Sequence, residues 1–191
     1  MNNDFITSVA MAADQIPGPL TVPWPMRGMP NAFQTFSAFP DWRDFVLALR
    51  LRDTLPQIIT AKYQRALKPH LMVWIDFDLI KVGEMAALAT LELALKDRYG
   101  HRVKKNKQGE LRFADLLRFM VDGDGLTEDK FPMSRRYGGT VVPVLTGKQR
   151  PSLADIRNSA AHGDPFDGYP WAGLLEMVRD LIEYAYRDFR P

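Results

Sequence analysis

The feature that most constrains the fold is the stretch from Met72 to Tyr99, where apolar residues recur every three or four positions. Its repeating members are Ile75, Leu79, Val82, Ala86, Ala89 and Leu93, and Leu88, Leu91 and Leu95 widen the same stripe. This period is typical of an α-helix that buries one face, and Gly100 is a stop signal. The spacing predicts a long central helix over residues 72–99.

Other stretches carry similar patterns. A helical segment begins near Asp41, a plausible N-cap, and is divided by Pro56. Short helices are predicted at 111–121 and 152–162, a longer one at 171–189, and a small hairpin at 141–145 within the irregular stretch 123–150. These patterns predict an all-α protein, an up-and-down bundle of four to five helices.

Residues 1–40 have a different character, since they hold six of the fourteen prolines. Proline removes backbone donors and favours extended neighbours, so no long helix is expected here. The aromatic residues Trp24, Phe33, Phe36 and Phe39 indicate that this part packs on the domain or on a partner. We therefore divide the chain into an extended Pro-rich arm, 1–40, and a helical domain, 41–191.

Composition narrows the function. The chain has 191 residues and a net charge of +2, so only local clusters could attract nucleic acid. It has no cysteine and three scattered histidines, so we expect no metal site and no cofactor. No apolar stretch reaches membrane-spanning length, and the apolar patch near the N-terminus lacks a basic segment before it, so a cytoplasmic protein is expected.

The segment "DIRNSAAHGD", residues 155–164, is the candidate site. Ser152 and Asp155 form a capping-box-like start, and Gly163 followed by Pro165 predicts the end of a helix of about three turns. At about 100° per residue, Leu153, Ile156 and Ala160 face the core. The opposite side then displays Arg157, Asn158 and His162 around the small Ala161.

These three side chains suffice for RNA cleavage without a metal. His162 could act as general acid or base near neutral pH, and Arg157 could stabilise charge on a phosphorane-like transition state. Asn158 could orient the histidine or bind a substrate oxygen. The spacing alone carries little weight, because Arg65 and His70 repeat it in "RALKPH", where Pro69 is expected to disrupt the helix.

With its place on the penultimate helix, "IRNSAAHG" resembles the HEPN superfamily (higher eukaryotes and prokaryotes nucleotide-binding domains). The signature is Arg, four to six residues, then His, with a polar residue after the Arg, and Arg157, Asn158 and His162 match it. The helix "MAALATLELALKDRYG" is similar to an earlier core helix of the family, so the resemblance covers about residues 70–190. Asp164 stands where some toxins of the family carry a Tyr.

The resemblance implies a metal-independent endoribonuclease that works as a homodimer, with two copies of the motif building one composite site. It also implies a toxin or an abortive-infection effector in antiphage defence, with an antitoxin or another defence protein as a possible partner. Other members are non-catalytic modules that bind a nucleotide or a protein, and this alternative stays open.

Two basic clusters are candidate RNA contacts, and both could equally be solvated loops. The first comprises Lys104, Lys105 and Lys107, and the second Arg135, Arg136, Lys148 and Arg150. Glu92 is expected to form an ion pair with Lys96 four residues later, and a secondary role at the site stays open for it. His70 and His101 are interpreted as ordinary surface residues at helix edges.

Overall fold

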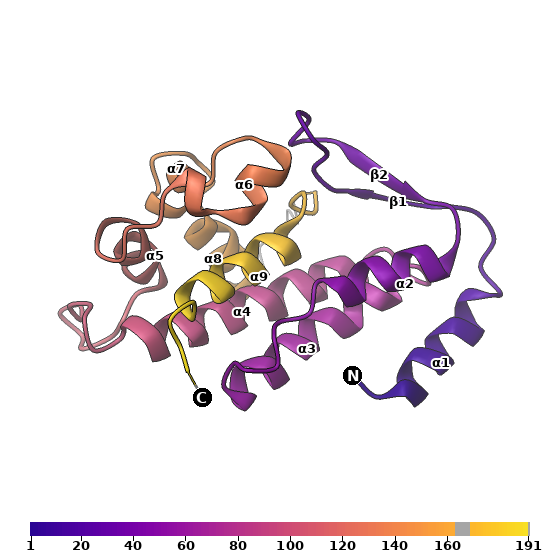
Figure 1. Ribbon diagram of the computed structural model, residues 1–191, viewed down its shortest axis with the longest axis horizontal. Helices are drawn as coiled ribbons and strands as arrows, with labels where there is room; N and C mark the ends of the chain where they lie inside the picture. Colours follow the sequence, from indigo (N-terminus) through magenta and orange to yellow (C-terminus); the bar gives the residue numbers. More distant parts are fainter. Residues whose placement is uncertain (163–168, 191) are drawn as a thin grey trace.

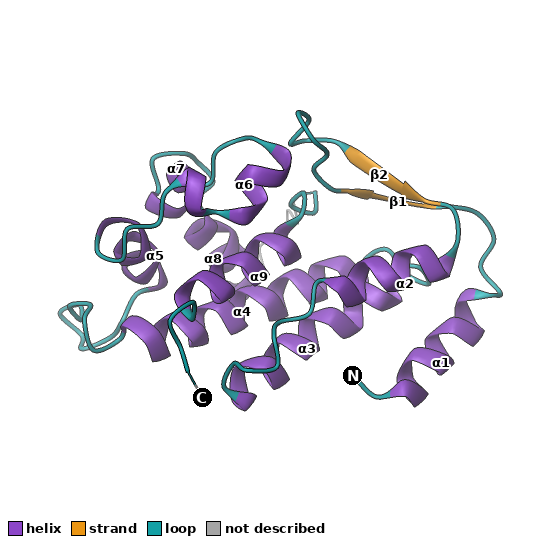
Figure 2. Ribbon diagram, in the orientation of Figure 1, coloured by secondary structure: helices purple, strands orange, loops and turns teal. Residues whose placement is uncertain are grey.

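The computed structural model describes residues 1–162 and 169–190, apart from the side chains of Ala160 and His162. This part of the chain is mostly helical, with one two-stranded sheet (Figures 1 and 2). The helices are α1 (Asn3–Ala13), α2 (Phe39–Ala48), α3 (Gln57–Met72), α4 (Leu79–Tyr99), α5 (Phe113–Asp122), α6 (Pro132–Tyr137), α7 (Val142–Thr146), α8 (Leu153–His162) and α9 (Leu174–Ala185), with a 3₁₀ turn, η1 (Glu128–Lys130). The expected helical class is confirmed, but the chain is divided into more and shorter helices than four or five.

The central element is α4, which packs against α3, α5, α8 and α9 (Figure 1). Leu88, Leu91 and Leu95 are at most 1% exposed, because helices cover α4 on several sides. The expected central helix is therefore present, but it begins at Leu79 rather than at Met72. The predicted buried stripe is only partly correct, because Val82 is 51% exposed and Ala89 is exposed as well. Residues 73–78 form the turn between α3 and α4, in which the carboxylate of Asp76 accepts a hydrogen bond from the backbone N–H of Asp78 at 3.1 Å.

Two boundaries differ from the sequence predictions for physical reasons. The apolar period runs across the turn because Val73 and Trp74 are buried as well, at 1% and 8% exposure. Helix α3 continues through Pro69, which lies in its last turns, where the missing backbone donor costs one hydrogen bond. Pro56 does divide the helical segment that was predicted to begin near Asp41, since α3 begins directly after this proline. Helix α2 begins two residues before the expected cap Asp41.

The first 40 residues are not extended throughout. Helix α1 precedes the first proline, Pro17, and Asn2 caps it by accepting a hydrogen bond from the backbone N–H of Asp4 at 3.1 Å. The antiparallel hairpin of β1 (Leu20–Pro23) and β2 (Phe33–Phe36) follows. Its residues Val22 and Trp24 are 0% and 1% exposed, so the hairpin is packed into the same core as the helices.

The segment 123–150 is also more ordered than the sequence suggested. The hairpin predicted at 141–145 is wrong, since α7 occupies these residues. The carboxylate of Glu128 explains the helix start, because it accepts hydrogen bonds from the backbone N–H groups of Val141 and Val142 at 2.8 to 3.0 Å. A carboxylate contributed by a residue 13 positions away leaves no local signal in the sequence.

The prediction that His70 is a surface residue is wrong. His70 is 1% exposed between α3 and α4, and its Nδ1 lies 2.8 Å from the carbonyl oxygen of Ala66. Gly83 of α4 makes room for it, since a Cβ there would lie 2.2 Å from that Nδ1. Burial lowers the pKa of His70 to about 4, and the hydrogen bond to Ala66 acts in the opposite direction.

This burial predicts a pH-dependent stability. A histidine whose pKa is lower in the folded state stabilises the fold above its ordinary pKa, and this stability is lost as the pH falls from about 6.5 towards 4. The free energy of unfolding of the wild type should therefore drop by up to about 1.4 kcal/mol per pH unit in this window. Urea unfolding at several pH values measures it. His101→Gln should keep the wild-type slope, whereas an unchanged slope in His70→Gln would contradict the assignment.

No helix in the described part of the chain has both the length and the apolar character needed to cross a membrane.

Candidate functional site

Helix α8 begins with the capping box that the sequence predicted. The side-chain oxygen of Ser152 accepts a hydrogen bond from the backbone N–H of Asp155 at 3.2 Å, and the Asp155 carboxylate accepts one from the backbone N–H of Ser152 at 2.9 Å. Arg150 also pairs with this carboxylate. The hydrogen bonds from Arg150 and then Ser152 lower the pKa of Asp155 to about 2. Asp155 is therefore ionised at neutral pH, and its hydrogen bonds hold the start of α8 in place.

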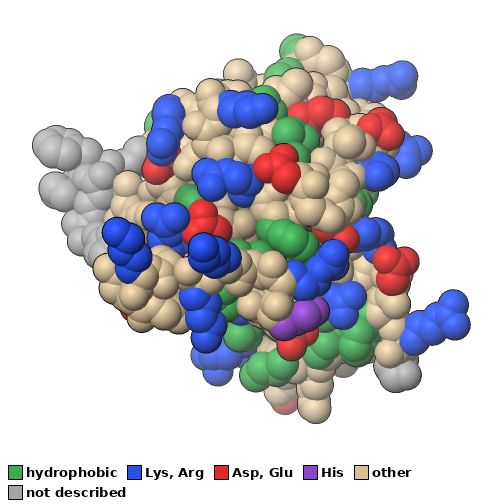
Figure 3. Space-filling model, turned by 90° about the vertical axis from the view of Figure 1, so that its left-hand side faces the viewer, with side chains coloured by type: hydrophobic (Ala, Val, Ile, Leu, Met, Phe, Trp, Pro, Cys, Tyr) green, Lys and Arg blue, Asp and Glu red, His purple; other side chains and the backbone are tan. Residues whose placement is uncertain are grey.

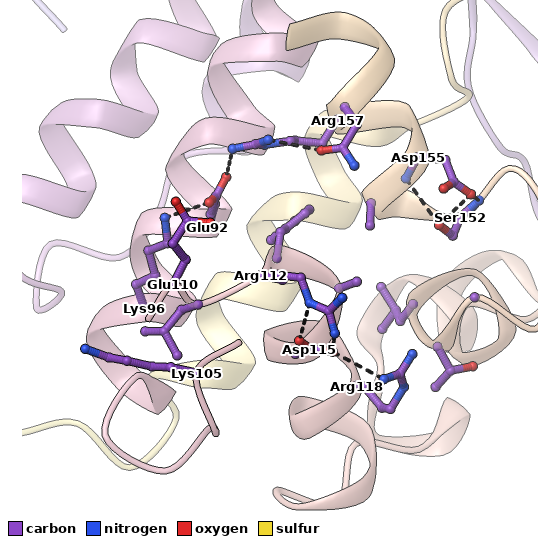
Figure 4. A pocket seen from close by; sticks show the side chains of 18 of the residues that line it. Glu92, Lys96, Lys105, Glu110, Arg112, Asp115, Arg118, Ser152, Asp155 and Arg157 are labelled. Atoms are coloured by element: carbon purple, nitrogen blue, oxygen red, sulfur yellow. Dashed lines mark hydrogen bonds and ion pairs between the residues drawn. The ribbon is translucent and has the colours of Figure 1, made fainter. Parts of the chain in front are cut away.

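The helix directs Arg157 towards α4 rather than into open solvent. The Arg157 guanidinium forms an ion pair with Glu92, and its Nη1 donates a hydrogen bond to Oδ1 of Asn158 at 3.0 Å (Figure 4). The Arg157 side chain is 31% exposed and that of Glu92 is 11% exposed. Lys96 also pairs with Glu92, at 2.7 Å, which confirms the predicted i, i+4 contact. In this arrangement Asn158 orients the arginine.

These residues lie along a cleft of about 840 Å³, which we call the α8 cleft. Figure 4 shows Glu92 and Arg157 above it and Lys105, Arg112 and Arg118 around it. Its charged and polar lining comes from α4, α5, α7, α8, the loop 104–112 and the α7–α8 connection: Glu92, Lys96, Lys105, Glu110, Arg112, Asp115, Arg118, Thr146, Arg150, Ser152, Asp155, Arg157 and Asn158. The lining has six Lys or Arg and four Asp or Glu side chains, and this net positive charge suits an anionic ligand such as a phosphate.

The structure places one member of each predicted basic cluster at the α8 cleft. Lys105 and Arg150 line the α8 cleft with Arg157, and Lys104 lines the adjoining surface. Lys107 is exposed on the same loop. Arg136 of the second cluster pairs with Glu176 and Asp180 of α9.

Arg135 and Lys148 belong to this second cluster as well, and each is exposed on its own element. Arg135 lies on α6, and Lys148 lies in the α7–α8 connection.

Two cations of the cleft were missed by the sequence analysis. Arg112 is the N-cap residue of α5 and Arg118 lies within this helix, and the carboxylate of Asp115 holds both, with closest distances of 2.8 Å and 3.3 Å. The available signal was their spacing of three residues on either side of Asp115, which places them on one side of the helix. Nothing local indicated that this side would face Arg157.

Some of the predicted site lies outside the described residues. His162 is the last residue of α8, but its side chain is not described. Gly163, Asp164 and Pro165 lie outside the described residues altogether. Leu153 is fully buried and Ile156 is partly buried, in agreement with the predicted core face. Among the side chains that the structure does describe, no three His, Asp or Glu residues lie together in a group that could hold a metal ion.

The pair of Glu92 with Arg157 predicts a measurable coupling. In a double-mutant cycle with Glu92→Ala and Arg157→Ala, we expect a coupling free energy of about 1 kcal/mol, because both groups are largely withdrawn from water. The more exposed pair Glu92 and Lys96 should give about 0.3 to 0.5 kcal/mol in a parallel cycle. Urea unfolding measures both, and equal couplings would argue against a special role for the arginine pair.

Comparison with protein-family models, with curated proteins and with solved structures finds no match to this chain. The function is therefore argued from the residues of the site.

Proposed function

We propose that the protein is a metal-independent endoribonuclease whose site is built around Arg157, Asn158 and His162. The observation that carries the proposal is the position of Arg157, which Asn158 and Glu92 hold at the edge of a cleft lined by further cations. An arginine fixed in direction loses less conformational freedom when it binds a phosphate. A guanidinium has five N–H donors, and these two contacts engage two of them.

The roles follow from the chemistry of each group. His162 accepts the proton of the ribose 2′-hydroxyl or donates one to the leaving 5′-oxygen. The 2′-oxygen forms a bond to phosphorus as the bond to the 5′-oxygen breaks, which leaves a 2′,3′-cyclic phosphate. Arg157 stabilises the negative charge on the phosphorane-like transition state. Glu92 is a positioning residue, since it acts through Arg157.

We further propose that two copies of the chain form a dimer through an apolar stripe on α4. The α4 stripe comprises Val82, Met85, Ala86, Ala89 and Leu93, which lie within an arc of roughly 100° at helical spacing. Val82 and Met85 are 51% and 47% exposed, and Glu92 lies at the edge of the arc. A second copy on this stripe would bring its own α8 close to the first, which agrees with the composite site that the family resemblance implies.

The resemblance extends the proposal to the biological role of the protein and to the arrangement of its helices. It favours a toxin or an antiphage effector, and it favours an antitoxin or another defence protein as partner. Under this proposal, α4, α8 and α9 lie in the part of the chain that resembles the family, about residues 70–190, and the segments before it are additions.

The activity is tested with purified protein and a mixed set of RNAs in excess chelator. Wild type should cleave and leave 2′,3′-cyclic phosphate ends, and His162→Ala should be roughly a hundredfold slower or worse. Arg157→Ala should lose a similar factor. Arg65→Ala is the matched control, since this exposed arginine lies outside the α8 cleft, and it should cleave as wild type does. If wild type is no faster than the two site variants, the enzymatic proposal is wrong.

The dimer is tested by placing a charge on the α4 stripe. Met85→Glu should give a monomer in sedimentation analysis and should lose cleavage, because a carboxylate on the stripe would be buried at the interface. Met11→Glu is the control, since Met11 is 67% exposed on α1, away from the stripe. A wild type that cleaves RNA as a monomer would contradict this part of the proposal.

A second candidate function is a non-catalytic module that binds a nucleotide or a protein partner. The observation that favours it is the pairing of Glu92 with both Arg157 and Lys96, an arrangement that also suits a purely structural ion pair. This alternative expects a stable dimer or a complex with another protein and no cleavage of RNA by wild type.

A further inference from the structure

Three hollows adjoin one another on the face that carries α5 and the loop before it. The α8 cleft shares Lys105, Arg112 and Arg118 with a second hollow of about 550 Å³, which we call the loop hollow. The loop hollow in turn shares Arg102 with a third hollow of about 290 Å³ near the end of α4, the terminal hollow. The shared residues place the three hollows side by side in a row, with Arg157 in the hollow at one end.

Cations are concentrated along this row. Residues 98–112 contain six Lys or Arg residues and one carboxylate, in a chain whose net charge is +2. Over all three hollows the lining has ten Lys or Arg and seven Asp or Glu side chains, so the row carries a net positive charge. Figure 3 shows this side of the molecule, with Lys and Arg side chains spread across it. The loop that carries three of the lysines has a fixed shape, because Oδ1 of Asn106 accepts hydrogen bonds from the backbone N–H groups of Gln108 and Glu110 at 3.0 Å and 2.8 Å.

Arg112 and Arg118, in the middle of the row, are held in position and remain accessible to a ligand. Asp115 holds Arg112 and Arg118 next to each other, while their side chains remain 65% and 53% exposed. Arg102 lies over the ring of Phe119, 4.9 Å from its centroid, so one side of its guanidinium is covered and supported. Supported guanidinium planes of this kind stack nucleobases in single-stranded RNA.

We propose that the three hollows bind the backbone of single-stranded RNA, which passes from Arg157 over Arg112 and Arg118 to Arg102. The continuity of the row favours an extended polyanion over a mononucleotide, which would fill only one hollow. The supported guanidinium of Arg102 favours a single strand over a duplex, because only an unpaired base is free to stack on it. This inference deepens the proposed function by naming the form of its substrate and the residues that guide it.

Binding is measured separately from cleavage. The probe is a fluorescent 2′-O-methyl RNA of about 20 nucleotides, which has no free 2′-hydroxyl to react, titrated by anisotropy over a range of KCl concentrations in chelator. The test variant is Arg112→Gln with Arg118→Gln. Its matched control is Arg50→Gln with Arg65→Gln, which removes two exposed arginines that line none of the three hollows.

For a single strand, each lost phosphate contact lowers the salt slope by about 0.7, so the test variant should lose about 1.4. Its affinity at about 0.15 M salt should fall about tenfold by the same relation. The control should retain the wild-type slope and affinity. Arg102→Ala, which leaves Arg112 and Arg118 in place, should weaken binding to RNA more than binding to a polyphosphate of equal charge, because polyphosphate has no bases to stack.

Three results would overturn the proposal. One is an equal loss in the test variant and the control, which would mean unspecific attraction. Another is duplex RNA bound as tightly as the single strand. The third is an acidic peptide that competes on equal terms with RNA, which would indicate a protein partner. If the row binds RNA as expected and wild type cleaves none, the nuclease proposal fails while this inference stands.

Discussion

Buried carboxylates on two neighbouring helices fix where the outer elements of this protein attach. Among the described residues, Glu84 and Glu92 of α4 and Glu176 and Asp180 of α9 are at most 8% exposed. A carboxylate withdrawn from water is stable only when donors or cations surround it. Each of these four therefore recruits partners from segments far away in the chain.

The consequences can be followed residue by residue. Glu176 accepts a hydrogen bond from Nε1 of Trp24 at 2.9 Å, so it holds the hairpin against α9. Arg136 pairs with both Glu176 and Asp180, which attaches α6 to the same helix. Glu84 accepts a hydrogen bond from the backbone N–H of Trp171 at 2.7 Å. Glu92 binds Arg157 in the same manner, and this contact sets the direction of the arginine on which the proposed function rests.

Local sequence patterns predicted the structure correctly where the interacting residues lie close together in the sequence. The capping box of Ser152 and Asp155, the division at Pro56, the short helix α5 and the pair of Glu92 with Lys96 were all predicted and are all present. It failed where the deciding partner is distant. The start of α7 depends on Glu128, His70 is buried because Gly83 lets α4 approach it, and Arg136 pairs with carboxylates of α9.

The same distinction between nearby and distant partners applies to the candidate site. The residues of α8 are enough to establish a capped helix that separates Leu153 from Arg157, because caps and helical period act over a few positions. They are not enough to show that Arg157 meets Glu92, or that Lys105, Arg112 and Arg118 line the same cleft. Those neighbours come from segments 39 to 65 residues away, and the packing of α4 against α5 and α8 alone brings them together, since burial of their apolar faces fixes where the charged edges lie.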